Sequence, residues 1–258
     1  MFCKHLLGVQ KCTTNIGVLL ELGRLPLIVY AQKASVKNWV RIHNSRTNNL
    51  IKFSYKGAQK DALDWLTKIK TNLAENGLGN YINEGDTLDK NLHHKYFCRL
   101  KDVFYQNSFA SITNPTGKLR TYGLVKESLD SESYLKSVQN IKHRTTLSRF
   151  RLSNHKLMIE IGRHQKLPIH ERICPFCPHG SIEDEIHFLI HCQLYEALRK
   201  PLFDMCIELK SNFSFYSHEE KFRFIMTCKH LCVEVARFIF RAMDLRNFLT
   251  SYFFNEHE

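Results

Sequence analysis

Three cysteines and one histidine stand at the spacing of a metal site in the second half of the 258-residue chain. Two residues separate Cys174 from Cys177, nine more precede His187, and a further four precede Cys192. Two thiolates from a tight turn, with a histidine and a cysteine from a following helix, complete a tetrahedron around Zn²⁺ at about 2.0 to 2.3 Å. The pattern predicts a zinc-knuckle-like CCHC insertion, whose four protein ligands leave no position for a catalytic water.

Two neighbouring residues compete for the fourth ligand position. On a regular α-helix His187 and His191 share a face, because residues four apart lie one turn from each other, whereas Cys192 lies about 100° further round. Regular helix geometry therefore favours His191. A local distortion of the helix end would bring Cys192 in, and a thiolate binds zinc more avidly than an imidazole, so both assignments stay open at this point. His179 is a weaker third candidate.

A different interpretation makes the three cysteines small buried apolar residues and His187 a surface residue. If the zinc interpretation holds, the metal does not fold the segment alone. Ordering the 19 residues from 174 to 192 costs about 1 to 2 kcal/mol each, and structural zinc returns about 10 to 16 kcal/mol. We therefore expect this segment, named the clip, to be fixed to a helical domain by packing.

A strongly basic segment, residues 142–172, leads into the clip. It holds eight Lys and Arg residues against two Glu residues. If it is one helix, two rows of cations repeat every seven residues, which favours contact with nucleic-acid phosphates over the alternative of a solvated helix face. A break at residues 153–154 would separate the two rows. The predicted nucleic-acid-binding residues are Arg144, Arg149, Arg151, Lys156 and Arg163.

Other residues with chemical potential favour structural roles. Cys228 and Cys232 lie four apart, but no further ligand pair is near them in sequence, so they are interpreted as buried thiols. Trp39 and Trp65 fall on apolar helical faces, which predicts core positions rather than base stacking.

Composition indicates the class of partner. The chain has 37 Lys and Arg residues against 25 Asp and Glu, a formal charge of +12, which favours nucleic acid first and acidic membrane surfaces second. The sequence shows no signal peptide and no apolar run long enough to span a bilayer. We expect an intracellular protein, nuclear or cytoplasmic, with reduced cysteines and no membrane partner.

The elements that position these residues are predicted to be helices. Apolar residues recur at helical spacing in 1–45, as two short helices, and in 61–75, 90–112, 219–228 and 231–249, with a turn at 114–117. The polar stretch 130–133 suggests a boundary. The predicted fold class is therefore mainly α, with a helical region over 1–128 and a helical carboxy-terminal domain over 129–258 that contains the clip.

In these segments the chain resembles the carboxy-terminal region of non-LTR (LINE-type) retrotransposon reverse-transcriptase polyproteins. HRTTLSRFRLSNHKLMIEIGRH, ERICPFC and EDEIHFLIHCQLYEALR stand in the family's order, and the likeness extends to residues 2–27 and 238–249. The resemblance implies that Cys192 is the last zinc ligand and that a polymerase-bearing chain is a partner. No two aspartates are adjacent, so the Y-x-D-D element that holds magnesium in polymerases is absent.

These observations predict a binding protein rather than an enzyme. The leading hypothesis is a zinc-dependent fragment that positions RNA or DNA through the CCHC site and the adjoining basic helix. The alternative is a non-catalytic protein-interaction scaffold, or an inactive remnant, in which zinc is only structural.

Overall fold

The computed structural model describes residues 2–45, 50, 53, 55, 57, 64–82, 87–114, 117–178 and 180–255. These residues form helices joined by turns, and the described part of the chain contains no β-strand, only an isolated antiparallel bridge between Ile173 and Ile182. The mainly α fold class is confirmed. Parts of the expected turn at 114–117 and of the expected helix start at 61–63 lie outside the described residues.

The chain divides into two compact units at positions other than the expected boundary after residue 128. Unit 1 combines residues 1–24 with 110–258, and unit 2 is the continuous stretch 25–109. Residue 128 therefore falls inside unit 1. The reason is tertiary: the first helices pack on α8 (Ile141–Arg151), more than a hundred residues later in the chain.

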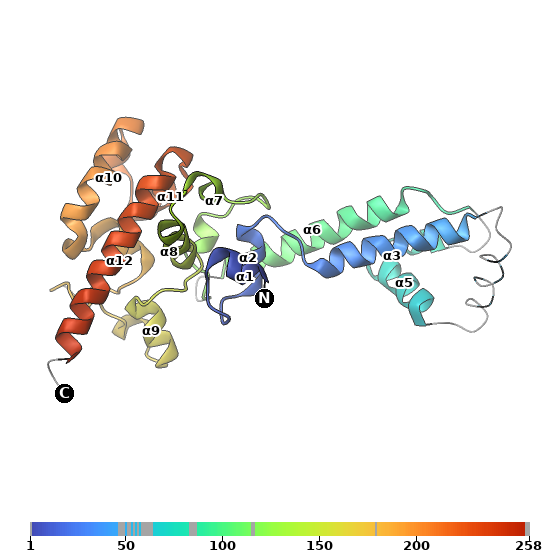
Figure 1. Cartoon of the computed structure of the whole chain (residues 1–258), viewed down its shortest axis with the longest axis horizontal. Coiled ribbons are helices and arrows are strands. Elements are labelled where there is room, and N and C mark those ends of the chain that lie inside the picture. Colours follow the sequence, from blue (N-terminus) through green and yellow to red (C-terminus); the bar gives the residue numbers. More distant parts are fainter. Residues whose placement is uncertain are drawn as a thin grey trace. The chain divides into compact units, whose positions relative to one another are not determined.

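The long helices in the described part of unit 2 (Figure 1) are α3 (Leu27–His43), α5 (Asp64–Glu75) and most of α6 (Leu92–Ile112). Their apolar faces meet in one core around Val36, Trp39 and Tyr96. Proline at position 26 starts α3, since its fixed φ suits a helix entry. At the other end Asn44 holds the chain before α6, because its side chain bonds both the N–H and the carbonyl of Leu88.

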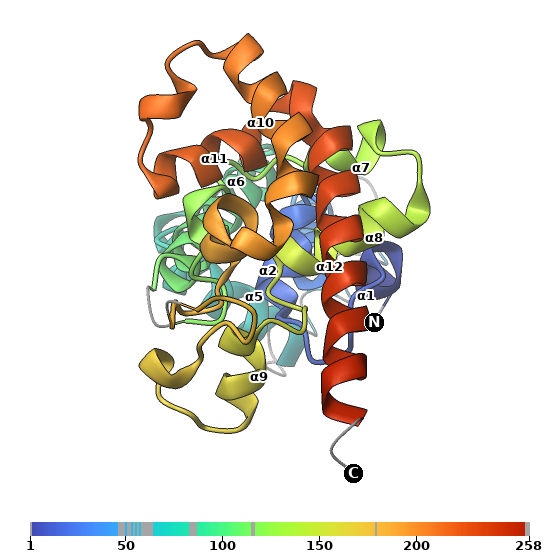
Figure 2. The ribbon, with the colours of Figure 1, turned by 90° about the vertical axis from the view of Figure 1, so that its left-hand side faces the viewer.

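Unit 1 is a helical bundle around the last helix, α12 (Cys232–Asn255). Figure 2 shows α12 crossing the unit, where it packs against α8, α10 (Glu196–Leu209) and α11 (His218–Thr227). The helix expected over 231–249 is present, and its apolar residues Val235, Phe238 and Ala242 are buried. The remaining helices of unit 1 are α1 (Phe2–Leu7), α2 (Asn15–Glu21), α7 (Tyr134–Ser137) and α9 (Met158–His164).

Local sequence signals explain several helix ends. The side chain of Asn140 accepts hydrogen bonds from the N–H groups of Lys142 and His143 and so begins α8. Ser217 and Glu220 form a reciprocal capping box that begins α11. Residues 1–45 contain three helices instead of the expected two, since a turn at Gly8, with φ of +63°, separates α1 from α2.

No helix in the described ranges is both long and apolar enough to cross a membrane.

Candidate metal centre

The first two cysteines of the clip lie on a narrow hairpin. The N–H of Cys174 donates to the carbonyl of Ser181 at 2.8 Å, and the N–H of Glu183 donates to the carbonyl of Arg172 at 2.9 Å. Gly180 closes the hairpin with a φ of +61°, a left-handed conformation that side chains disfavour. The two-residue spacing then places both thiols on the same turn.

The hairpin brings Cys174, Cys177, His187 and Cys192 together as one group whose ligand atoms all lie within 4.8 Å of one another. The Sγ of Cys177 is 3.4 Å from Nε2 of His187 and 3.5 Å from Sγ of Cys192, and the Sγ atoms of Cys174 and Cys192 are 3.9 Å apart. Ligand atoms around a tetrahedral ion at 2.0 to 2.3 Å are separated by roughly 3.3 to 3.8 Å. The four predicted residues therefore form a cluster that can hold a metal ion.

Cys192 reaches this cluster because the helix after the hairpin is not an α-helix. Residues His187–His191 form a π-helical turn, and the N–H of Cys192 donates to the carbonyl of His187, five residues earlier, at 2.9 Å. A hydrogen bond between residues five apart places them one turn from each other, which an α-helix does for residues four apart. The distorted helix end that favours Cys192 is therefore present.

His191 lies outside the cluster. Its side chain is exposed, its ring stands edge-on to His187 with centroids 4.8 Å apart, and it stacks on His218 at 4.6 Å. The metal-binding group contains Cys192 in its place. His179, the third candidate, is outside the described residues.

A buried arginine on α10 holds the π turn in shape. Nε of Arg199 donates to the carbonyl of Leu189 at 2.8 Å, and one Nη donates to the carbonyls of Phe188 at 3.3 Å and Cys192 at 2.8 Å. These carbonyls lie at a helix end, where intrahelical partners run out. Sequence reasoning missed Arg199, because nothing in its spacing from the ligands distinguishes it from a surface arginine.

Because the thiols of the cluster lie close together, they ionise together more readily when a cation is bound. The neighbouring Cys192 thiol and burial raise the pKa of Cys174 to about 12, so the sulfur atoms resist ionising together in the absence of positive charge. Three thiolates and a neutral histidine around a divalent ion carry a net charge of −1. The buried guanidinium of Arg199 lies nearby: burial lowers its pKa, and the neighbouring Cys192 acts in the opposite direction.

The acidic triplet at 183–185 fixes the clip to its surroundings. Asp184 accepts the N–H of His187, the first residue of the π turn, at 2.7 Å. Glu183 is buried and forms a two-bond pair with Arg246 of α12, with both distances 2.7 Å. It also accepts the N–H of Met158 at 2.6 Å, the first residue of α9. Glu183 thereby fixes the clip to α9 and α12.

Arg151 does not take the predicted phosphate-binding role, because it is buried at 3% exposure. Its Nε lies 2.7 Å from Glu21 and one Nη lies 2.8 Å from Glu132, while another Nη donates to the carbonyl of Met226. Two carboxylates therefore occupy the guanidinium. Arg151 is a structural residue of the unit 1 core.

The two predicted rows of cations do not share one surface. Helix α8 ends at Arg151, Ser153 takes a φ of +49°, and α9 starts only at Met158. The break foreseen at residues 153–154 is present. Arg144 is half-buried and donates to the carbonyl of Val138, and Arg163 pairs with Glu160 at 2.8 Å.

Arg149 and Lys156 are exposed, and both line one groove of about 370 Å³ in unit 1. Nε of Arg149 donates to the carbonyl of Gly8 at 2.7 Å, and this hydrogen bond leaves its Nη atoms for other contacts. Lys118 and His164 line the same groove. Sequence reasoning missed Lys118, which lies some thirty residues before Arg149 and reaches the groove only through the fold.

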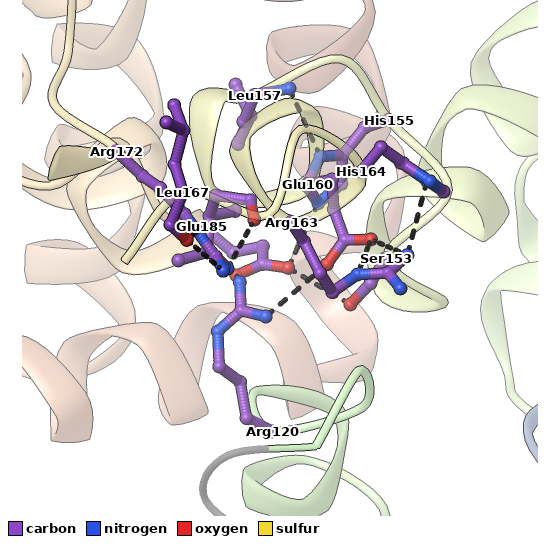
Figure 3. A network of polar contacts seen from close by, with 11 residues as sticks. Arg120, Ser153, His155, Leu157, Glu160, Arg163, His164, Leu167, Arg172 and Glu185 are labelled. Atoms are coloured by element: carbon purple, nitrogen blue, oxygen red, sulfur yellow. Dashed lines mark hydrogen bonds and ion pairs between the residues drawn. The ribbon is translucent and has the colours of Figure 1, made fainter. Parts of the chain in front are cut away.

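A polar network beside the groove fixes the turn that carries Lys118 (Figure 3). Arg120, two residues later, donates to Glu185 at 2.7 Å and pairs with Glu160 at 3.5 Å. Glu185 also accepts from Ser153 at 3.1 Å and lies 3.0 Å from Nε2 of His155. Burial by itself raises the pKa of Glu185, but these partners lower it to about 2. The hydrogen bond with His155 is the largest of the lowering causes.

The remaining candidates are structural in the described part of the chain. The metal cluster is the only group of its kind found there, and it excludes Cys228 and Cys232, which are half-buried. Trp39 is buried and its indole N–H donates to Tyr55. Trp65 is 39% exposed, so the expected core position holds for Trp39 but not for Trp65.

Comparison of the chain with protein-family models, with curated proteins and with solved structures gave no match. The retrotransposon resemblance of the sequence therefore stays a prediction.

Proposed function

We propose that the cluster binds Zn²⁺ as a structural ion. Three thiols and one imidazole are a donor set that zinc favours, and four protein ligands close the coordination sphere. The burial of Cys174, His187 and Cys192 supports this role, since a buried ion contributes its binding energy to folding. Metal analysis of the purified protein tests it: one zinc per chain is expected, and a folded, metal-free protein would exclude it.

We propose that the protein uses this zinc-stabilised unit to bind RNA or DNA. The observation that carries the proposal is the groove, where Lys118, Arg149 and Lys156 come together from three separate segments. Phosphate contacts of this kind supply most of the sequence-independent affinity for nucleic acid. Glu160 also lines the groove, but its carboxylate is engaged by Arg163 and Arg120.

The metal centre and the groove are linked through Glu183. This residue closes the hairpin of the clip, binds the first turn of α9 and pairs with Arg246 on α12. Lys156 lies two residues before the start of α9, and α12 contributes Asp244 and Asn247 to the groove. An ion that orders the clip therefore helps to hold two walls of the groove in place.

A gel-shift titration against salt tests the nucleic-acid proposal. Binding is expected to weaken steeply as salt rises, and the double variant Arg149→Gln/Lys156→Gln is expected to bind more weakly with a shallower salt dependence. The control Lys210→Gln/Lys229→Gln removes the same charge from exposed positions away from the groove. Unchanged binding by the groove variant would favour the protein-interaction scaffold.

The resemblance to retrotransposon polyproteins suggests the setting of this activity. We propose that the module positions nucleic acid for a polymerase-bearing chain and does not itself catalyse. Stimulation of such a polymerase on a primed RNA template by the wild-type protein, but not by the groove variant, is the expected result.

A further inference from the structure

Unit 2 holds a disproportionate share of the positive charge. Residues 25–109 contain 13 Lys and Arg residues against seven Asp and Glu, a net charge of +6. One third of the chain therefore carries half of the total charge of +12. None of the residues assigned to the groove lies in this unit.

Helix α3 carries three of these cations and no acidic residue. Within its 17 residues they are Lys33, Lys37 and Arg41. The three are spaced four apart, so they form one row along the helix, with about 6 Å of rise between neighbours. Lys37 and Arg41 are exposed, and no carboxylate among the described residues pairs with any of the three. The row is free to meet an external anion.

This row is unfavourable for the isolated helix. Like charges four residues apart destabilise a helix by about 0.2 to 0.5 kcal/mol per pair. No pairing with a carboxylate among the residues that the structure describes offsets the repulsion, in contrast to Lys95 of α6, which pairs with Asp89 at 2.8 Å. A polyanion lying along α3 would offset it.

Aromatic side chains adjoin the same row. The ammonium of Lys33 lies 4.2 Å from the centre of the Phe97 ring on α6, and Tyr30 packs beside Phe97 with ring centroids 5.9 Å apart. Tyr30 is 47% exposed. On α6 the exposed Lys101 lies one helical turn after Phe97. Cations interleaved with an exposed aromatic ring are typical of surfaces that bind single-stranded nucleic acid, where bases stack on the rings.

An acidic membrane surface fits this face less well. A helix that lies in a membrane interface needs a free apolar face to insert. Helix α3 buries Val36, Trp39 and Val40 in the core of unit 2, so the middle of the helix has no such face to offer.

We propose that the α3 row, defined as Lys33, Lys37 and Arg41, is a second nucleic-acid contact that binds the phosphates of a single strand, with Tyr30 as a stacking platform. This inference rests on the proposed function in that both surfaces bind the same class of polymer. It goes further by assigning a binding role to unit 2.

The test compares three variants of the full chain for binding to a 30-nucleotide single-stranded RNA across a salt series. The row variant is Lys33→Gln/Lys37→Gln/Arg41→Gln, the groove variant is Arg149→Gln/Lys156→Gln, and the charge-matched control is Lys136→Gln/Lys210→Gln/Lys229→Gln. We expect the row variant to bind about tenfold more weakly, and the slope of log affinity against log salt to fall by about 2, because each single-strand phosphate contact contributes about 0.7. The control should bind like the wild type.

The outcomes separate this inference from the proposed function. Loss of affinity in the row variant but not in the groove variant supports the inference and contradicts the groove, and the reverse result overturns the inference alone. Equal losses in the row variant and the control overturn it, because net charge would then explain the effect. It is also overturned if the row variant loses binding to phosphatidylserine vesicles but not to RNA, or if the wild type binds no RNA. An unchanged far-ultraviolet circular dichroism spectrum verifies that each variant is folded.

Discussion

At the scale of single residues, the fourth ligand shows how backbone conformation selects among neighbouring side chains. His191 and Cys192 are adjacent in sequence, and both carry atoms that bind zinc. The π turn directs Cys192 into the cluster and leaves His191 exposed against His218. The choice is therefore made by one main-chain hydrogen bond rather than by the chemistry of either side chain.

Substitution of the two residues separates their roles. Cys192→Ala is expected to lose stoichiometric metal and to unfold at lower denaturant concentration, because a buried ligand is removed. His191→Ala is expected to keep one metal per chain. Cobalt substitution provides the measurement, since the visible spectrum of Co²⁺ reports tetrahedral thiolate coordination. A normal cobalt spectrum in Cys192→Ala, or its loss in His191→Ala, would reverse the assignment.

Glu185 predicts a pH dependence of stability at the same scale. Its pKa is lowered from 4.5 to about 2, so the folded state binds its proton less readily than the unfolded state does. The stabilisation is complete above about pH 4.5 and is lost as the pH falls through about 2. The shift corresponds to about 3 kcal/mol as an order of magnitude.

We therefore expect the free-energy difference between wild type and Glu185→Gln to shrink as the pH falls from about 5 to about 2, because protonated Glu185 resembles glutamine. Urea unfolding at a series of pH values measures this difference. Metal loss at low pH affects both proteins and cancels in the comparison. A difference that is independent of pH would show that Glu185 is not held ionised by Arg120 and His155.

At the scale of elements, the π turn between the hairpin and α10 is the part of the fold on which the metal centre depends. Its carbonyls are held by Arg199, which is 5% exposed and donates to three of them. A π turn is a rare conformation that usually marks a functional position. Here the π turn places His187 and Cys192, which are five residues apart, one turn from each other, and a regular α-helix would not do so.

Arg199→Met is expected to weaken metal affinity about 10- to 100-fold, as loss of outer contacts to metal ligands typically does. Competition with a chromophoric zinc chelator measures the affinity. Lys200→Met is the matched control, because this neighbour on α10 is exposed. Equal affinities in the two variants would show that the ligands hold the turn without help from Arg199.

At the scale of the whole molecule, unit 1 is assembled from both ends of the chain. The carboxylate of Glu21 on α2 meets Arg151 on α8 and the hydroxyl of Tyr134, all buried. Glu132 completes the pairing of Arg151. This buried cluster joins residues 1–24 to the rest of unit 1. The compact unit therefore includes both sides of the expected boundary after residue 128.

Arg151→Met is expected to destabilise unit 1 by about 3 to 5 kcal/mol, because it leaves the buried charge of Glu21 unpaired. Adding Glu21→Gln should recover part of the loss. Circular dichroism at 222 nm reports the helices of both units, and both tryptophans lie in unit 2, so tryptophan fluorescence follows unit 2 separately as an internal control. Exposed Arg149→Met is the matched variant, and an equal loss there would contradict the role given to Arg151.

The sequence by itself determined the helical class, the positions of most helices and three residues of the cluster, Cys174, Cys177 and His187, because apolar periodicity and ligand spacing are local properties. The π turn decided between His191 and Cys192. The family resemblance, the bound zinc and the nucleic-acid partner remain predictions. Tertiary structure decided three further features: the burial of Arg151, the meeting of Lys118 with Arg149 and Lys156 in one groove, and the packing of residues 2–24 in unit 1. Each depends on contacts between residues far apart in the chain. The seven-residue spacing of the arginines is the same whether an arginine contacts solvent, a phosphate or a buried glutamate, so the spacing does not distinguish these cases.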